Sequence, residues 1–136
     1  MTVPVTAMTA AILTLLFIFL SFQVVKQRVR TETSFGAGND EHMDMVRGCQ
    51  SNLIEYTPIT LIMLALLELS SAHHLSLMVL AVIFMIARFL HPFGMHQHQA
   101  GKGLRLRQIA MLMTWLVMAA LALWTIYICV TVNLLS

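Results

Sequence analysis

The chain has 136 residues, of which 59% are hydrophobic and 10% are charged, and its formal net charge is +2. This length suits one domain, and this composition excludes an ordinary soluble globular protein. The charge is small and forms no basic patch interleaved with aromatic residues, so we expect no nucleic acid among its partners. Residues 1–136 are therefore predicted to form a single all-α integral membrane domain.

The first apolar run extends from Val5 to Val25 without a charged residue. As a helix, it is long enough to cross a bilayer core of about 30 Å. No basic residue precedes Lys26 and no small-residue cleavage site follows the run. These flanks favour a spanning helix over a signal peptide.

A polar segment of mixed charge follows from Lys26 to Arg47, and glycines near its centre predict turns. The next apolar run predicts a second spanning helix from about Asn52 to Leu69. The segment Ser70–His74 then contains neither Lys nor Arg. It predicts a tight turn on the other side of the membrane.

The third predicted span runs from Leu75 to Leu90, or to Gly94 if it is longer. A second polar loop, His91–Arg107, is punctuated by Pro and Gly, and the fourth span is predicted from about Ile109 to Leu135. All eight Lys and Arg residues lie in or beside the two polar loops. By the positive-inside rule, both loops are cytoplasmic and both termini lie opposite, in an up-down-up-down four-helix bundle.

Polar residues lead directly into the apolar part of the second span. Asn52 and Glu55 are three residues apart, so a helix places them on one face. Moving a charged side chain into hydrocarbon costs roughly several kcal/mol of free energy. A Glu within the membrane that faces the interior of a bundle therefore indicates a functional site. The alternative is that the helix begins here, at the membrane surface, with Asn52 as its cap and Glu55 favoured by the helix dipole. This stretch alone leaves both interpretations open.

Arg88 and His91 form a second pair on one helix face, at the expected cytoplasmic end of the third span. The alternative is that these two residues bind no ligand. Basic side chains at the carboxyl end of a helix also complement the helix dipole or extend to the membrane surface. Glu55, Arg107 and either Lys26 or Arg28 are expected at the same membrane level. Together they predict a cationic cup with one carboxylate, suited to an anionic tripeptide that carries carboxylates and an amino group.

The second polar loop contains a cluster of possible soft-metal ligands. It has no defined ligand geometry and lies in a loop rich in Gly and Pro, so no metal site is predicted. The members of this cluster are His91, Met95, His96 and His98.

These motifs, in this order and spacing, resemble the bacterial branch of the membrane-associated proteins in eicosanoid and glutathione metabolism, the MAPEG family. The resemblance covers most of the chain. The family's helix-two motif is similar to Asn52, Glu55, Tyr56 and Pro58 of this chain. Its helix-three motif is similar to Arg88 and His91. Its basic residue at the start of helix four is similar to Arg107, which precedes Met111, Thr114 and Trp115.

The resemblance implies a homotrimer in the bacterial inner membrane, with glutathione as co-substrate bound between neighbouring subunits near the cytoplasmic face. An apolar small-molecule substrate would arrive from the membrane lipids. Arg107 is the implied catalytic residue, because a nearby guanidinium favours the nucleophilic thiolate over the thiol. The implied glutathione-binding residues are Lys26, Arg28, Arg47, Asn52, Glu55, Arg88, His91 and Arg105.

The sequence also departs from the family pattern. Gly48 stands where the family has an Arg four residues before the Asn, and Arg47 lies one position away. Gln50 stands where a His is common in the family, and Met95 stands where eicosanoid-forming relatives have a Tyr. Gln108 stands where some relatives have a small residue with a hydroxyl group. These changes argue against a specialised eicosanoid-forming enzyme. They leave open a general glutathione transferase or peroxidase, and equally a protein that binds glutathione or lipid without turnover.

Two other functions are consistent with parts of the sequence. One is a lipid- or glutathione-binding membrane protein without catalysis. The other is a small proton-coupled drug exporter, which also uses four short helices and one membrane-embedded Glu. The basic neighbours of Glu55 weigh against the exporter, because nearby cations keep a carboxylate ionised. So does the expected position of Glu55 at the interface and not at the midplane.

Overall fold

The computed structural model describes residues 1–134 and is all-helical. Four helices are each long and apolar enough to cross a membrane, which agrees with the predicted four spans. A short π-helical segment, Cys129–Leu134, continues the last of them. The four helices are α1 (Pro4–Thr31), α2 (Glu41–Leu69), α3 (His74–Gln99) and α4 (Arg105–Ile128).

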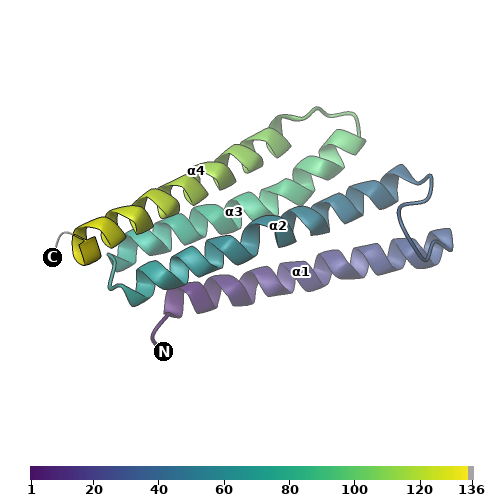
Figure 1. The fold of residues 1–136 in the computed structure, drawn as a ribbon. Coiled ribbons are helices and arrows are strands. Elements are labelled where there is room, and N and C mark those ends of the chain that lie inside the picture. Colours follow the sequence, from purple (N-terminus) through teal and green to yellow (C-terminus); the bar gives the residue numbers. More distant parts are fainter. Residues whose placement is uncertain (135–136) are drawn as a thin grey trace.

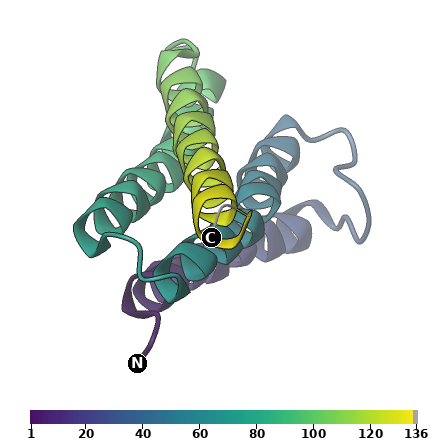
Figure 2. The same ribbon diagram turned by 60° about the vertical axis from the view of Figure 1, so that its left-hand side comes forward.

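Successive helices run antiparallel, so both termini and the α2–α3 turn lie at one end of the bundle and the other two loops at the opposite end (Figure 1). Contacts join α1 with α2 and α3 with α4; α2 also packs on both α3 and α4, and α3 packs on α1. Within residues 1–134, α1 does not contact α4, and Figure 2 shows these two helices on opposite sides of the bundle. α2 and α3 therefore each contact all three other helices.

The inner faces of the helices form one apolar core. Leu13, Leu64, Phe84 and Leu121, one from each helix, are almost completely buried there. Large apolar side chains also cover the outside of every helix, as expected where the surroundings are lipid. Exposed examples are Phe22 on α1, Ile62 on α2, Ile86 on α3 and Leu116 on α4.

The first polar loop is shorter than predicted, because helical structure extends into it from both sides. α1 continues past Val25 to Thr31, and α2 starts at Glu41. The carboxylate of Asp40 caps α2 by accepting hydrogen bonds from the backbone N–H groups of His42 (2.9 Å) and Met43 (3.4 Å). Gln27 donates to the other oxygen of Asp40 (2.5 Å), and this bond in particular lowers the pKa of the carboxyl.

The second polar loop is also shorter than predicted, since α3 continues through Pro92 to Gln99 and α4 starts at Arg105. A proline removes only one backbone donor, and a membrane helix continues where its neighbours support it. His91 and Gly94 are both buried inside the bundle, which gives that support. Only residues 100–104 connect the two helices, and Leu135, the predicted end of the fourth span, lies outside the described residues.

The amino end of α1 is fixed by a side chain from the far end of α2. One oxygen of Glu68 accepts from the backbone N–H of Val5 (2.8 Å). Its other oxygen accepts from the backbone N–H (3.0 Å) and the hydroxyl (2.8 Å) of Thr6. α1 has no side-chain cap of its own, so Glu68 supplies acceptors that the first turn otherwise lacks.

Candidate functional site

Arg88 occupies the centre of the predicted site and is only 1% exposed. Its guanidinium donates to the side-chain oxygen (2.6 Å) and the backbone oxygen (3.3 Å) of Asn52 on α2, and to the hydroxyl of Thr114 on α4. It also lies 5.2 Å from the ring centre of Tyr56 and 5.5 Å from that of Phe84. Arg88 therefore joins α2, α3 and α4 in the interior of the protomer.

Asn52 and His91 accompany Arg88 in the interior. Asn52 lies three turns inside α2, so the alternative in which it caps a helix start is wrong. Its amide nitrogen contacts the sulfur of Met111 on α4 (3.4 Å). His91 is 3% exposed, and its Nδ1 has no hydrogen-bond partner within residues 1–134. The unpartnered nitrogen leaves this imidazole free to bond to a further group.

Glu55 belongs to the same helix face by spacing but is exposed in the protomer. It accepts a hydrogen bond from Ser51 (2.6 Å) and borders an open polar pocket of about 440 Å³. Only α2 lines this polar pocket, and its charged residues are Asp44, Arg47 and Glu55. The structure therefore brings Arg47 and Glu55 together, apart from the buried Arg88 group.

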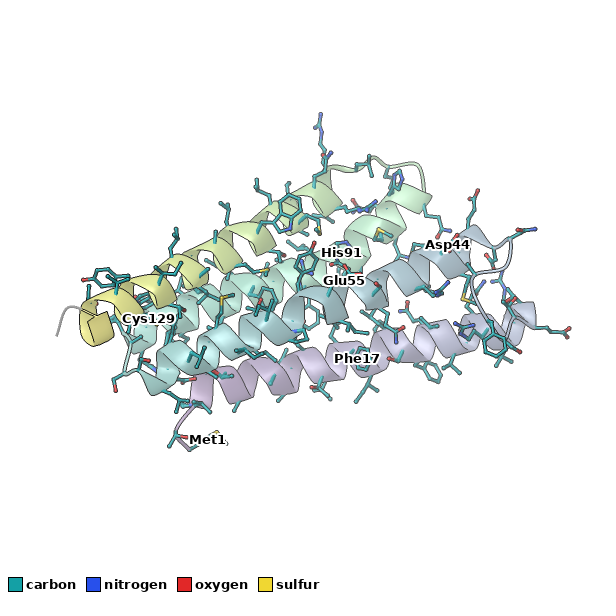
Figure 3. All side chains as sticks on the ribbon, in the orientation of Figure 1. Met1, Phe17, Asp44, Glu55, His91 and Cys129 are labelled. Carbon is teal, nitrogen blue, oxygen red and sulfur yellow. The ribbon has the colours of Figure 1, made fainter. Side chains whose placement is uncertain are left out.

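Glu55 also lies deeper in the bundle than predicted. Gln50 donates to Ser21 of α1 (2.7 Å), and because the helices are antiparallel, Glu55 lies near the level of Phe17. Figure 3 shows Glu55, His91 and Phe17 at this common level. Phe17 is well inside the apolar run Val5–Val25, so Glu55 does not mark the end of the apolar region. Its depth no longer argues against a membrane-embedded function such as transport.

Arg105 and Arg107 both lie in the first turn of α4, as exposed side chains. The backbone of Arg107 packs against Gly94 of α3, about one turn after His91. Glu55 on α2 lies at the level of the same imidazole (Figure 3). Arg107 and Glu55 therefore lie on two different helices that flank this part of α3.

The two basic candidates on α1 differ in their surroundings. Arg28 donates to the backbone oxygens of Thr33 (3.3 Å) and Ser34 (2.9 Å), so it holds the α1–α2 loop. Lys26 is exposed. Of the two, Lys26 is the one whose cation is not already bonded to that loop.

The predicted site thus divides into two groups. The inner group consists of Arg88 and His91, which are buried, and Asn52, which accepts a hydrogen bond from Arg88. The outer group is exposed and able to meet a ligand or a neighbouring subunit. It consists of Lys26, Arg47, Glu55, Arg105 and Arg107.

Sequence reasoning did not assign roles to Tyr56 and Thr114, which contact Arg88. A threonine in an apolar helix is too common a feature to have revealed this contact. In the described part of the chain, no three His, Cys, Asp or Glu side chains gather as a metal centre would require.

An apolar groove of about 320 Å³ between α1 and α2 adjoins the polar pocket, because Ile54 lines both. The remaining lining of this apolar groove includes Leu13, Phe17, Leu53 and Leu61. Such a pair of sites can place a polar molecule beside an apolar one.

The profile of the MAPEG family matches residues 6–127, which is most of the chain. The chain belongs to the MAPEG family. Among curated relatives of this MAPEG protein is the inner membrane protein YecN of Escherichia coli K12, which is 26% identical over 123 residues. The match covers 88% of this chain and 91% of YecN. YecN of Escherichia coli O6:H1 matches with the same identity and coverage. No solved structure matches this MAPEG chain.

Proposed function

We propose that this MAPEG protein is a glutathione-dependent membrane enzyme that acts on apolar electrophiles or lipid peroxides. The observation that carries the proposal is that the polar pocket bordered by Arg47 and Glu55 adjoins the apolar groove, with Ile54 lining both. The polar pocket suits part of a charged tripeptide, and the apolar groove suits a substrate that is dissolved in the bilayer. Family membership supports the same assignment, because the family includes glutathione transferases.

In this proposal, glutathione binds between neighbouring protomers of a homotrimer. Arg47 and Glu55 are exposed on α2. They lie at about the same depth along the bundle as Phe19 and Phe22, which are exposed on α1. Charged groups at such a depth are costly unless protein or water covers them. A neighbouring subunit placed against α2 provides the cover, and closes the polar pocket around the ligand.

The outer group supplies the contacts to glutathione. Glu55 binds its amino group, and Lys26, Arg47 and Arg105 bind its carboxylates. Asn52, Arg88 and His91 were predicted to contact the ligand directly. The burial of Arg88 and its hydrogen bond to Asn52 support a different part for these two residues, which is to hold α2 against α3 and α4.

Arg107 stabilises the glutathione thiolate, the form that reacts as a nucleophile. In transfer, the sulfur forms a bond to an electrophilic carbon, and a leaving group departs or the product carbon takes a proton. In peroxide reduction, the sulfur attacks one peroxide oxygen and the O–O bond breaks. The resulting alkoxide takes a proton, and a second glutathione completes the disulfide with release of water.

The relative's name supports placement in the bacterial inner membrane. The charge distribution then puts both basic loops in the cytoplasm, where glutathione is dissolved. The proposal uses no metal ion.

Equilibrium binding of glutathione to detergent-purified protein tests the proposal, with the ultraviolet absorbance of the thiolate measured in parallel. We expect wild type to bind glutathione and to show a thiolate signal, which Arg107→Ala loses. Lys102→Ala is the matched control, because this exposed cation lies in the short loop just before α4. Glutathione bound only as the thiol would indicate a non-catalytic binding protein. The absence of binding would favour the lipid-binding or exporter function.

A further inference from the structure

Gly94 lies where α3 meets the first turn of α4. A Cβ atom built on Gly94 would lie 2.5 Å from the backbone nitrogen of Arg107 and 2.8 Å from its Cα. Real Cβ atoms essentially never approach other atoms closer than 3.0 Å, and backbone atoms cannot rotate away as a side chain can. The two backbones are therefore in contact at a distance that only glycine permits.

The other glycines of the chain do not make such a contact. A Cβ at Gly48 would meet the terminal methyl group of Met95 at 3.3 Å, which is a flexible partner. A Cβ at Gly101 or Gly103 would have no atom within 4 Å. The close approach is thus specific to Gly94 and to one residue of α4, Arg107.

Arg107 is also the residue that is proposed to stabilise the glutathione thiolate. His91 precedes Gly94 by three residues, so both lie on the face of α3 that is turned into the bundle. Packing of α4 onto Gly94 consequently sets how far Arg107 stands from that face. No side-chain cap holds the start of α4, so its position depends on packing contacts such as this one.

We propose that Gly94 is a positioning residue for the glutathione chemistry, because its missing side chain sets the distance between Arg107 and the glutathione sulfur. The inference rests on the proposed function, in which Arg107 stabilises the thiolate. Gly94 itself contacts neither glutathione nor the apolar substrate. It acts through the backbone of Arg107.

An alanine at position 94 requires the first turn of α4 to move by about 0.9 Å before the contact with the Arg107 nitrogen reaches the ordinary 3.4 Å. Displacements of about 1 Å at a reacting centre cost up to roughly 100-fold in rate. We expect Gly94→Ala to lower the acid dissociation constant of the bound thiol about tenfold, which is one pKa unit. The affinity for an S-alkyl glutathione, which has no thiol to ionise, is expected to change by less than about twofold, because that ligand needs no thiolate stabilisation.

The experiment measures thiolate absorbance per bound glutathione against pH, together with the affinity for S-hexylglutathione, in wild type, Gly94→Ala and Val79→Ile. Normalisation to bound ligand removes any contribution from misfolded protein. Val79→Ile is the matched control, since it adds one methyl group at an exposed position of the same helix, outside the polar pocket. The expected result is a shifted thiol titration in Gly94→Ala alone, with S-hexylglutathione affinity retained.

An unshifted titration in Gly94→Ala overturns the inference, provided that the wild-type thiolate depends on Arg107. If no Arg107-dependent thiolate exists in wild type, the proposed function fails first, and the two failures are thereby distinguished. Should Gly94→Ala not fold, Gly103→Ala displaces the start of α4 by a different route, because residue 103 has a φ of +94° that alanine rarely adopts. A normal thiol titration in that variant also contradicts the inference.

Discussion

Arg88 shows how one residue holds together the helices that carry the candidate site. In the described part of the chain, the groups that accept hydrogen bonds from its guanidinium or stack on it are uncharged, namely Asn52, Thr114 and the rings of Tyr56 and Phe84. Its planar group donates toward α2 and α4 at once, which a compact ammonium cannot do. The buried cation is therefore balanced by oriented dipoles and aromatic faces, and it fixes the positions of those groups.

Replacement of Arg88 by methionine is expected to destabilise the protein. The change keeps an apolar chain but leaves the Asn52 and Thr114 oxygens without their donor, at about 1–3 kcal/mol for each buried group left unsatisfied. Arg88→Lys is expected to lie between wild type and Arg88→Met. Chemical denaturation in detergent, followed by circular dichroism, measures the effect.

Arg105→Met is the control for this change, because Arg105 is exposed on α4. Equal stability of Arg88→Met and Arg105→Met would contradict the structural role of Arg88. The sequence predicted that Arg88 belongs to the site, but it did not predict that the side chain points into the bundle interior. A three-residue spacing defines a helix face, and only the packing of α4 determines that this face is covered.

At the scale of the helices, the apolar runs and the loops between them were sufficient to predict four spans that alternate in direction. The helix ends were predicted less well, because charged residues were taken to end helices that continue outside the apolar run. α2 begins eleven residues before Asn52, at a cap provided by Asp40. α3 continues through Pro92 because α4 packs beside it, and this contact is invisible in a local sequence window.

Glu68 gives a test of how helix ends are held. Glu68→Leu removes the acceptors for the N–H groups of Val5 and Thr6 and for the Thr6 hydroxyl. We expect a loss of roughly 1–3 kcal/mol of stability, the usual cost of a buried donor left unsatisfied. Faster hydrogen exchange of the first turn of α1 is the local measurement. Glu32→Leu, in the exposed α1–α2 loop, is the control, and unchanged exchange in Glu68→Leu would exclude the cap.

At the scale of the whole molecule, the antiparallel bundle puts both termini at the end opposite the two basic loops (Figure 1). The direction of the bundle in the membrane follows from charge and stays a prediction. Alkaline phosphatase, which is active only outside the cytoplasm, is expected to be active when fused after residue 136. Fused after Gly101, it is expected to be inactive, whereas a fluorescent protein fused there is bright. The reverse pattern would place the basic loops outside the cytoplasm.

During synthesis, α1 leaves the ribosome long before Glu68, because 63 residues separate Val5 from its acceptor. Until α2 has crossed the bilayer, the first turn of α1 lacks the partners that fix it in the finished protein. The first two helices consequently reach their final form only as a pair. We therefore expect α1 and α2 to form a helical hairpin in the membrane before α3 and α4 assemble onto it.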